Sequence, residues 1–400
     1  MKQEQFLNLA SAEEALKKFR DAVNPAPLGE EQILLKEARG RVLSRDVIAS
    51  INVPIYDRSN FDGYAVRAED TFGAEETQPL SLKLNREILA CGVIPEEQLL
   101  PGTATPISTG GVLPRGADGV VMIENTHPDG DRIRVLKPIV PGGGVSLAGS
   151  DLGAGEVVLR RGDLLGFRET GTLAAFGETH VWVWKKPKVA VVSTGDELIA
   201  PGETMQLGRV YDSNSLVVGH AAEELGCQVE FLGIVRDDEK QLGPVVRRGL
   251  EADMLLLSGG TSKGEGDQNY RVFAQFKNPG ILVHGVSLKP GKPLCLAVLE
   301  GTPAAILPGF PTSAIFTFTR FIAPILREMA GLPPEKNTRL KAKVPLKIQS
   351  DKGRTEFNLI HLTDGPQGKA AYSTGKGSGS VTGFSRADGF MAVSYTHLTL

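Results

Sequence analysis

Three stretches of small polar residues have the composition of a phosphate- or oxyanion-binding site. Each directly follows an apolar segment: Ser193–Glu197, Ser258–Asp267 and Pro308–Ser313. Glycine amides and Ser or Thr hydroxyls at a helix start bind anions, because the first backbone N–H groups have no partner within the helix. Acidic residues in the same loops favour a divalent cation, which takes oxygen ligands. Any one such loop is more often a tight turn, but three of them at one edge of a sheet favour a site.

Two further motifs leave a functional and a structural interpretation open. Lys289 and Lys292 lie in a turn stiffened by Pro and Gly, where they either bind a phosphate or oxyanion or stay solvated. Asp62, which precedes Gly63, either does chemistry or caps its own turn. His284 has no second His at helical spacing and is interpreted as a packed residue rather than a ligand.

Alternating strand and helix patterns over residues 188–330 must position these loops. Apolar strands are predicted at Val189–Val192, Glu230–Val235, Met254–Ser258 and Ala304–Leu307, and helices near Ser215–Leu225, Lys240–Leu250, Gln268–Gln275 and Thr312–Met329. This alternation predicts a doubly wound parallel sheet, in which ligands bind beyond the carboxyl ends of the strands.

The residues before this region predict two intertwined units. Ser11 and Glu14 form a capping box at the start of a helix. From about residue 80 to 144, short strands broken by Gly and Pro predict a small β domain. Mixed structure returns afterwards, with a helix around Phe167–Phe176, so the β domain is expected to be an insertion. A short helix is also predicted to end near Gly40, and strands at Leu340–Ile348 and Thr355–Leu362.

Length and composition limit the class of protein. The chain has 400 residues, with 44 Lys and Arg against 47 Asp and Glu, and a net charge of −3. This balance argues against a general nucleic-acid binder, and the length exceeds one domain. The three cysteines form no zinc or disulfide pattern, which fits a reducing compartment. Because neither a signal peptide nor a membrane-spanning apolar run is visible, we expect a cytoplasmic protein without membrane contact.

Taken together, these motifs resemble the molybdopterin molybdenumtransferase family, which includes the E domain of gephyrin. The matching stretches occur in the family's order and cover nearly the whole chain: Asp57–Val66, Ser108–Gly111, Gly116–Asp118, Ser193–Leu198, Ser258–Gly260, Lys289–Pro293 and Leu307–Pro311. Each stretch is modest alone, whereas the ordered set is highly specific.

The resemblance implies a multidomain α/β plus β fold in four parts. An elongated N-terminal domain (1–50 and 145–185) carries the inserted β domain (51–144). A doubly wound α/β domain similar to molybdopterin adenylyltransferase (186–332) follows, and then a C-terminal β-barrel domain (333–400), expected to be truncated. The family works as a homodimer with the site between the α/β domain of one subunit and the inserted domain of the other. Its reaction inserts molybdate into adenylyl-molybdopterin and yields molybdenum cofactor and AMP.

The resemblance also implies roles for individual residues. The catalytic residues would be Asp62, Thr109, Glu197, Asp237 and Asp267. Mg²⁺ or another divalent cation would be held by Asp196, Glu197 and Asp267. Substrate would be bound by Ser258, Gly259, Gly260, Ser262, Lys289, Lys292, Pro308, Gly309, Pro311, Thr312, Ser313 and Ser378. Transient contact with molybdopterin adenylyltransferase and molybdoenzyme chaperones is also implied.

The sequence departs from the family pattern in three places. Gly285 stands where many members have Lys or Arg, Phe310 stands where Asn is common, and Ser394–Leu400 match no expected closing strand.

Two other functions remain as alternatives: adenylyl transfer from ATP to molybdopterin, and a gephyrin-like scaffold without catalysis. The additional domains argue against the first, because adenylyl transfer needs only the α/β domain. The intact acidic and basic positions argue against the second.

Overall fold

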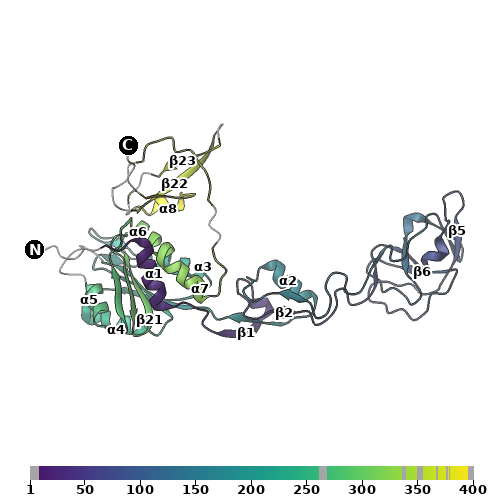
Figure 1. The fold of residues 1–400 in the computed structure, drawn as a ribbon, viewed down its shortest axis with the longest axis horizontal. Coiled ribbons are helices and arrows are strands. Elements are labelled where there is room, and N and C mark those ends of the chain that lie inside the picture. Colours follow the sequence, from purple (N-terminus) through teal and green to yellow (C-terminus); the bar gives the residue numbers. More distant parts are fainter. Residues whose placement is uncertain are drawn as a thin grey trace, which may run out of the picture.

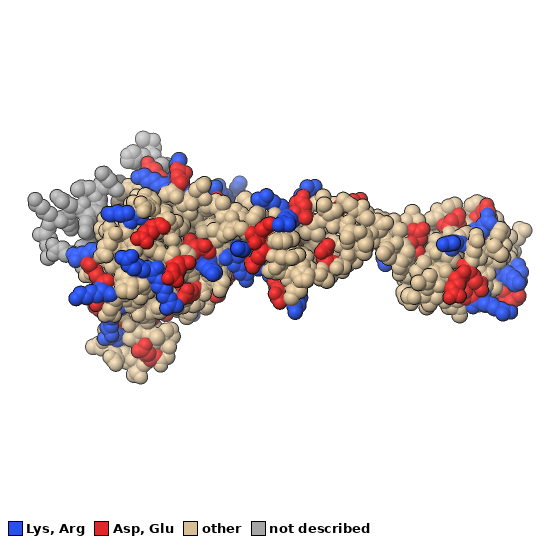
Figure 2. All heavy atoms as spheres, turned by 90° about the horizontal axis from the view of Figure 1, so that it is seen from below, with Lys and Arg blue, Asp and Glu red and all other residues tan. Residues whose placement is uncertain are grey.

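The computed structural model describes residues 9–260, 268–335, 339–348, 355–365, 368–374, 377 and 379–394. Figure 1 shows an elongated molecule with an α/β domain and a C-terminal sheet at one end, a β domain at the other, and a slender middle part between them. On the face seen in Figure 2, acidic and basic side chains are interspersed, and the narrow neck before the β domain is largely uncharged. No helix in the described ranges has the length and apolar character that crossing a bilayer requires.

A six-stranded sheet forms the centre of the α/β domain. Its strands are β13 (Lys188–Thr194), β16 (Gln228–Val235), β17 (Met254–Gly259), β18 (Gly280–His284), β20 (Cys295–Leu299) and β21 (Thr302–Pro308), in the order β16-β13-β17-β21-β20-β18. The first four strands in that order are parallel, and β20 runs antiparallel to both of its neighbours. The doubly wound sheet is therefore confirmed, and the antiparallel pair at its edge was not predicted.

Helices cover both faces of this sheet. On one side lie α1 (Ala12–Val23), α3 (Asn214–Glu224), α6 (Pro311–Thr317) and α7 (Ala323–Met329), with the π-helical η4 (Phe318–Ile322) joining the last two; on the other lie α4 (Glu239–Gly249) and α5 (Gln268–Ala274). Successive residues of a strand point to opposite faces. Val189 and Val191 accordingly join the first core, and Ala190 and Val192 the second.

Helix α1 packs on the α/β sheet, not on the elongated domain to which the sequence assigned it. The predicted capping box is present, with Ser11 and Glu14 each bonding the other's backbone. Ala12, Ala15 and Phe19 are buried in the same core as the sheet residues. The reason is the apolar stripe of the helix, which needs a larger apolar partner than the short ladders of the middle part provide.

The middle part consists of three two-stranded ladders and a helix. The pairs are β1 (Glu30–Leu34) with β12 (His180–Trp184), β2 (Val47–Ile48) with β11 (Val157–Leu159), and β3 (Arg58–Ser59) with β10 (Val145–Ser146); the helix is α2 (Phe167–Ala175). Leu43, Leu173, Phe176 and Val183 are buried in its core. The helix predicted to end near Gly40 is only the three-residue 3₁₀ turn η1 (Leu35–Glu37).

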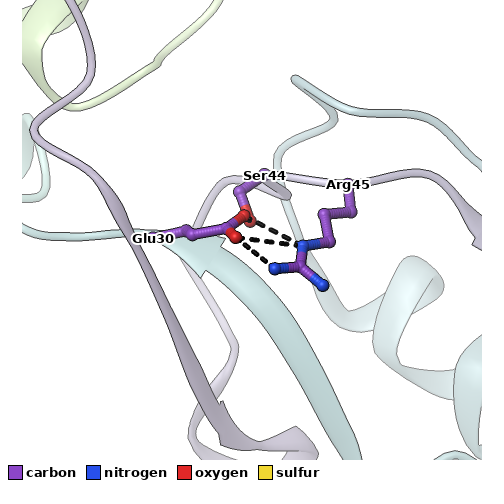
Figure 3. Close-up of polar contacts among 3 residues, drawn as sticks. All are labelled: Glu30, Ser44 and Arg45. Atoms are coloured by element: carbon purple, nitrogen blue, oxygen red, sulfur yellow. Dashed lines mark hydrogen bonds and ion pairs between the residues drawn. The ribbon is translucent and has the colours of Figure 1, made fainter.

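A polar cluster joins the two sides of this middle part. Arg45 donates through Nε and Nη2 to the Glu30 carboxylate, which also accepts from the Ser44 hydroxyl at 3.0 Å (Figure 3). The Arg45 guanidinium lies 3.8 Å from the ring centroid of Trp182. Since Glu30 and Trp182 come from opposite ends of the middle part in sequence, Arg45 ties its first and last strands together.

The distal β domain is a six-stranded sheet in the order β7-β4-β6-β5-β9-β8. Its strands are β4 (Gly63–Val66), β5 (Leu80–Leu84), β6 (Thr103–Ile107), β7 (Gly119–Met122), β8 (Thr126–Asp129) and β9 (Arg132–Val135), with the 3₁₀ turns η2 (Ala68–Thr71) and η3 (Ile123–Asn125). Leu82, Val121 and Ile133 are buried in one of its two cores. A Cβ at Gly63 would lie 2.0 Å from the Val121 carbonyl oxygen, so β4 can approach β7 this closely only with glycine there.

The C-terminal part rests on the α/β domain. Its long central strand β22 (Thr355–Gly365) pairs antiparallel with β23 (Gly368–Ser373) and β24 (Gly389–Ser394), near the short helix α8 (Thr382–Ser385). The predicted strand at Leu340–Ile348 is represented, in the part that the structure describes, by the bridge of Lys343 to Ala370. Ser394, which the sequence placed in an unmatched tail, pairs with Thr355 at the end of β24.

Candidate active site

A pocket of about 1190 Å³ lies between the α/β domain and the C-terminal sheet. Its lining includes many of the residues that the sequence singled out: Glu197, Ser258, Gly259, Gly260, Lys289, Lys292, Pro308, Gly309, Pro311, Thr312 and Ser313. The opposite wall comes from β22 and the segments after β23, among them Glu356, Phe357, Asn358 and Gly379. The three loops expected at one edge of the sheet thus open into one cavity.

Close backbone packing shapes the floor of the pocket. A Cβ at Gly259 would lie 2.1 Å from Thr194 Oγ1 and 2.3 Å from the Thr194 carbonyl oxygen. A Cβ at Gly309 would lie 3.8 Å from Gly259 Cα. The ends of β13, β17 and β21 therefore meet with no room for a side chain at Gly259, and peptide groups line this part of the pocket.

Two buried asparagines fasten these loops together, and sequence reasoning missed both. Asn214, at the start of α3, donates to Ser258 Oγ at 2.9 Å and to the Gly309 carbonyl at 2.8 Å. Asn269, in α5, donates to Thr194 Oγ1 at 2.7 Å and to the Gly260 carbonyl at 3.0 Å. The polar residues before α3 could have indicated a role for Asn214. A polar residue at the start of a helix, however, is usually only its N-cap.

The two lysines of the turn both line the pocket. Lys289 belongs to the short strand β19 (Leu288–Lys289), which pairs in parallel with the start of β22. Its Nζ lies 3.3 Å from Glu356 Oε1. The Glu356 side chain is only 9% exposed, whereas that of Lys289 is 42% exposed. A carboxylate of the C-terminal sheet therefore faces one of the two cations expected to bind an anion.

Asp196, Glu197 and Asp237 form an acidic rim beside the pocket, and of the three only Glu197 lines it. The pKa of Asp237 is raised, first by partial burial and then by the negative charges of Asp196 and Glu197, and a hydrogen bond from the Asp196 backbone partly offsets this. Arg209 and Arg236 both donate to the Asp196 carbonyl, and Arg236 Nη1 lies 3.9 Å from Asp196 Oδ1. The repulsion among the carboxylates provides a reason for a cation to bind here.

The expected metal ligands form no complete set in the described part of the chain. Among those residues, no group of three His, Cys, Asp or Glu is arranged to hold a metal ion. Asp196 and Glu197 supply hard oxygen donors of the kind that Mg²⁺ prefers. The third expected ligand, Asp267, lies outside the described residues, as do Ser262 and Ser378.

Asp62 and Thr109 do not line the pocket. They belong to the distal β domain, which Figure 1 places at the far end of the molecule from the α/β domain. Asp62 Oδ1 accepts from the Thr109 N–H at 2.7 Å and from its hydroxyl at 3.0 Å. These bonds, the backbone one first, lower the pKa of Asp62. Within one chain, the structure joins these two residues to each other and not to the rim.

Two of the three departures from the family pattern, Gly285 and Phe310, lie in described parts of the α/β domain, and of the two only Phe310 lines the pocket. Gly285 has a φ of +90°, in the left-handed region where Lys or Arg would be strained. Its N–H donates to the Leu294 carbonyl at 2.8 Å. Phe310 is 60% exposed and lines the pocket near Gly379. It therefore replaces a polar side chain by an apolar surface at the mouth of the pocket.

The fold and the pocket define a multidomain protein built on an α/β ligand-binding domain. Residues 10–177 match the family described as the MoeA N-terminal region (domain I and II), residues 190–328 a probable molybdopterin binding domain, and residues 341–395 the MoeA C-terminal region (domain IV). The chain belongs to the molybdopterin molybdenumtransferase family, as its motifs predicted.

Individual relatives match along most of their length. The chain is 35% identical over 333 residues to molybdopterin molybdenumtransferase 2 of Mycobacterium tuberculosis, covering 82% of each chain. It is 35% identical over 342 residues to the molybdopterin molybdenumtransferase of Nostoc sp., covering 84% of this chain and 78% of the relative. A solved structure of a molybdopterin biosynthesis MoeA protein from Pyrococcus horikoshii superposes with a TM-score of 0.82 at 35% identity, covering 96% of this chain and 95% of the other.

Proposed function

We propose that the chain is an enzyme that inserts molybdate into adenylylated molybdopterin, releasing AMP and forming molybdenum cofactor. Its relatives in Mycobacterium, Nostoc and Haemophilus are named molybdopterin molybdenumtransferases. The observation that carries the proposal is the convergence of the three polar loops and both lysines on one pocket.

The chemistry explains why these residue types belong together. Cleaving a phosphoanhydride while an oxyanion enters concentrates negative charge in a small space. Lys289 and Lys292 stabilise that charge, together with the peptide groups around Gly259 and the start of α6. The same proposal assigns Ser262, Asp267 and Ser378 to the site on the family resemblance alone.

The proposal includes Mg²⁺ at the acidic rim. The raised pKa of Asp237, caused in part by Asp196 and Glu197, supports a role for a cation that relieves their repulsion. A bound divalent cation would also polarise the phosphate oxygens of the adenylyl group. Asp196 and Glu197 would be its ligands among the described residues.

The proposal also includes a homodimer. Asp62 and Thr109 lie in the distal domain, far from the pocket of their own chain, so only another copy would bring them to the rim.

The proposed domain limits are 51–144 for the inserted domain, 186–332 for the α/β domain and 333 onward for the C-terminal domain. Because α1 packs on the α/β sheet, it is counted with the α/β domain, and the elongated domain then comprises residues 24–50 and 145–185. A cytoplasmic location and transient contacts with molybdopterin adenylyltransferase and molybdoenzyme chaperones complete the proposal.

Product analysis tests the reaction. Purified protein is incubated with adenylyl-molybdopterin, molybdate and Mg²⁺, and separately with molybdopterin and ATP. We expect AMP and molybdenum cofactor in the first mixture only. Adenylyl-molybdopterin formed in the second mixture would indicate adenylyl transfer, and no product in either mixture would indicate a protein without catalysis.

A further inference from the structure

Glu356 occupies an unexpected place for a carboxylate, because it lines a pocket proposed to bind anions. Its backbone is fixed there, since β19 and β22 pair in parallel with Lys289 directly opposite Glu356. Its side chain is almost fully buried, and its Oε1 lies 3.3 Å from Lys289 Nζ. A buried carboxylate is stabilised by such a cation, so the two charges depend on each other.

The C-terminal sheet cannot easily carry Glu356 away from the pocket. Phe357, the next residue, stacks on Phe316 of α6 with ring centroids 5.4 Å apart. Phe390 packs edge-on against both rings, at 5.7 Å from Phe316 and 5.4 Å from Phe357. The Thr312 hydroxyl donates to the Ser380 carbonyl at 3.0 Å. Apolar and polar contacts therefore hold β22 against the α/β domain, and Glu356 remains a fixed negative charge beside Lys289.

We infer that Glu356 sets the anion affinity of the pocket, because its carboxylate competes with the substrate oxyanion for Lys289. An entering dianion gains the attraction of Lys289 and at the same time meets the repulsion of Glu356. The pocket then holds simple oxyanions weakly, and only an anion that also contacts the surrounding peptide groups and Lys292 is retained. This inference rests on the proposed function, and it adds a residue of the C-terminal domain that the sequence did not single out.

The charge of Glu356 is tested by calorimetric titration of sodium molybdate, and separately sodium sulfate, into the full chain. Glu356→Gln keeps the size of the side chain and removes its charge. We expect both anions to bind about tenfold more tightly, which is the order of effect expected of one charge a few ångströms away at a partly exposed site. Glu356→Asp retains the charge and should stay within about twofold of the original protein.

Two controls separate charge from structure. In a Lys289→Met background, Glu356→Gln should change affinity much less than tenfold, because the cation for which the two anions compete is absent. Asp364→Asn removes a carboxylate farther along β22, where Asp364 forms an exposed ion pair with Lys369 of β23, and should leave anion binding unchanged. If Glu356→Gln lowers the thermal midpoint too far to be measured, Glu356→Met provides an apolar side chain of similar length at this buried position.

Unchanged or weaker anion binding in a folded charge-removing variant overturns the inference, as does an equal gain in the Lys289→Met background. AMP release by the unaltered protein is measured in parallel. Normal AMP release without tighter anion binding rejects the role of Glu356 alone. Tighter anion binding in a protein that never releases AMP rejects the proposed reaction and retains the role of Glu356.

Discussion

Gly259 lies so close to Thr194 that no other residue fits without movement of the backbone. Its φ of +154° already disfavours a side chain, and the added Cβ would overlap two oxygens of Thr194. We expect Gly259→Ala to lower the free energy of unfolding by about 1–3 kcal/mol, as overpacking usually does. Gly260→Ala is the matched control, because a Cβ there has nothing within 4 Å. Denaturant unfolding of both variants checks this, and equal stability would contradict it.

The protonation of Asp237 provides a second prediction at this scale. Its pKa is raised by burial and by Asp196 and Glu197, so the folded protein binds this proton more tightly than the unfolded chain does. The contribution of Asp237 to stability therefore improves as pH falls through its raised pKa, and becomes unfavourable as pH rises above it. Asp196→Asn removes one of the repelling charges and should lower the pKa of Asp237.

Carboxyl carbon NMR measures this titration directly. Glu203→Gln, in the neighbouring loop, changes a carboxylate that does not act on Asp237 and serves as the control. Saturating Mg²⁺ should lower the pKa of Asp237 in the original protein, if the ion binds at the rim as proposed. If the pKa of Asp237 is the same in the Asp196→Asn protein, the charge of Asp196 does not raise it, and this prediction is wrong.

At the scale of elements, the side chain of Asn214 joins the start of α3 to the ends of β17 and β21. Removing its side chain leaves Ser258 Oγ and the Gly309 carbonyl without their donor. We expect Asn214→Ala to lower the free energy of unfolding by about 1–3 kcal/mol, and to weaken substrate binding because both loops line the pocket. Glu223→Gln, an exposed residue of the same helix, should have little effect. Chemical denaturation and AMP-release kinetics measure the two consequences, and a fully active, stable Asn214→Ala protein would show that the loops hold their positions without it.

The contacts of Arg45 with Glu30 of β1 and Trp182 of β12 stabilise the pairing of these two strands in the middle part. Arg45→Lys retains the positive charge but loses the planar guanidinium that contacts Glu30 and stacks on Trp182 (Figure 3). We expect the thermal midpoint to fall by about 2 °C, together with a change in tryptophan emission. Arg132→Lys, in the distal domain, is a control that should leave tryptophan emission unchanged, because both tryptophans belong to β12. Identical emission in the Arg45→Lys protein would show that the stacking contact is dispensable.

At the scale of the whole molecule, the proposed homodimer predicts that each site needs Asp62 of one copy and Glu197 of another, because Asp62 lies far from the pocket of its own chain. Asp62→Asn and Glu197→Gln proteins should each be nearly inactive. When the two are mixed and allowed to exchange subunits, hybrid dimers contain one site with neither substitution, so about a quarter of the original activity should return at equal amounts. A mixture that stays inactive although light scattering shows dimers would indicate that each chain forms its site alone.

The sequence predicted the parts of this architecture that local patterns determine. Runs such as Met254–Leu257 are apolar throughout, as a strand buried on both faces requires, and the capping box at Ser11 is local. The pairing of β18 with β20 was missed because the Lys-Pro-Gly-Lys turn between them reads as an isolated loop.

Features that depend on tertiary contacts were beyond sequence reasoning. Asn214 meets Gly309, 95 positions later in the chain, and only the folded sheet brings them together. Glu356 faces Lys289 because β22 pairs with β19, and nothing near Glu356 in the sequence indicates this. The placement of α1 was wrong for the same reason, since a helix is assigned by default to the domain that follows it in the chain.

Because α1 packs on the α/β sheet, residues 24–187 form one segment inserted into the α/β domain. This segment begins after α1 and ends before β13, and its two ends lie side by side, since the Lys185 N–H donates to the Gly29 carbonyl at 2.9 Å. Its entry and exit are therefore one hydrogen bond apart, and a short turn could join them. In evolutionary terms, the middle part and the distal domain form one cassette, which a single insertion or deletion event could add to or remove from an α/β ancestor without disturbing the core around Phe19.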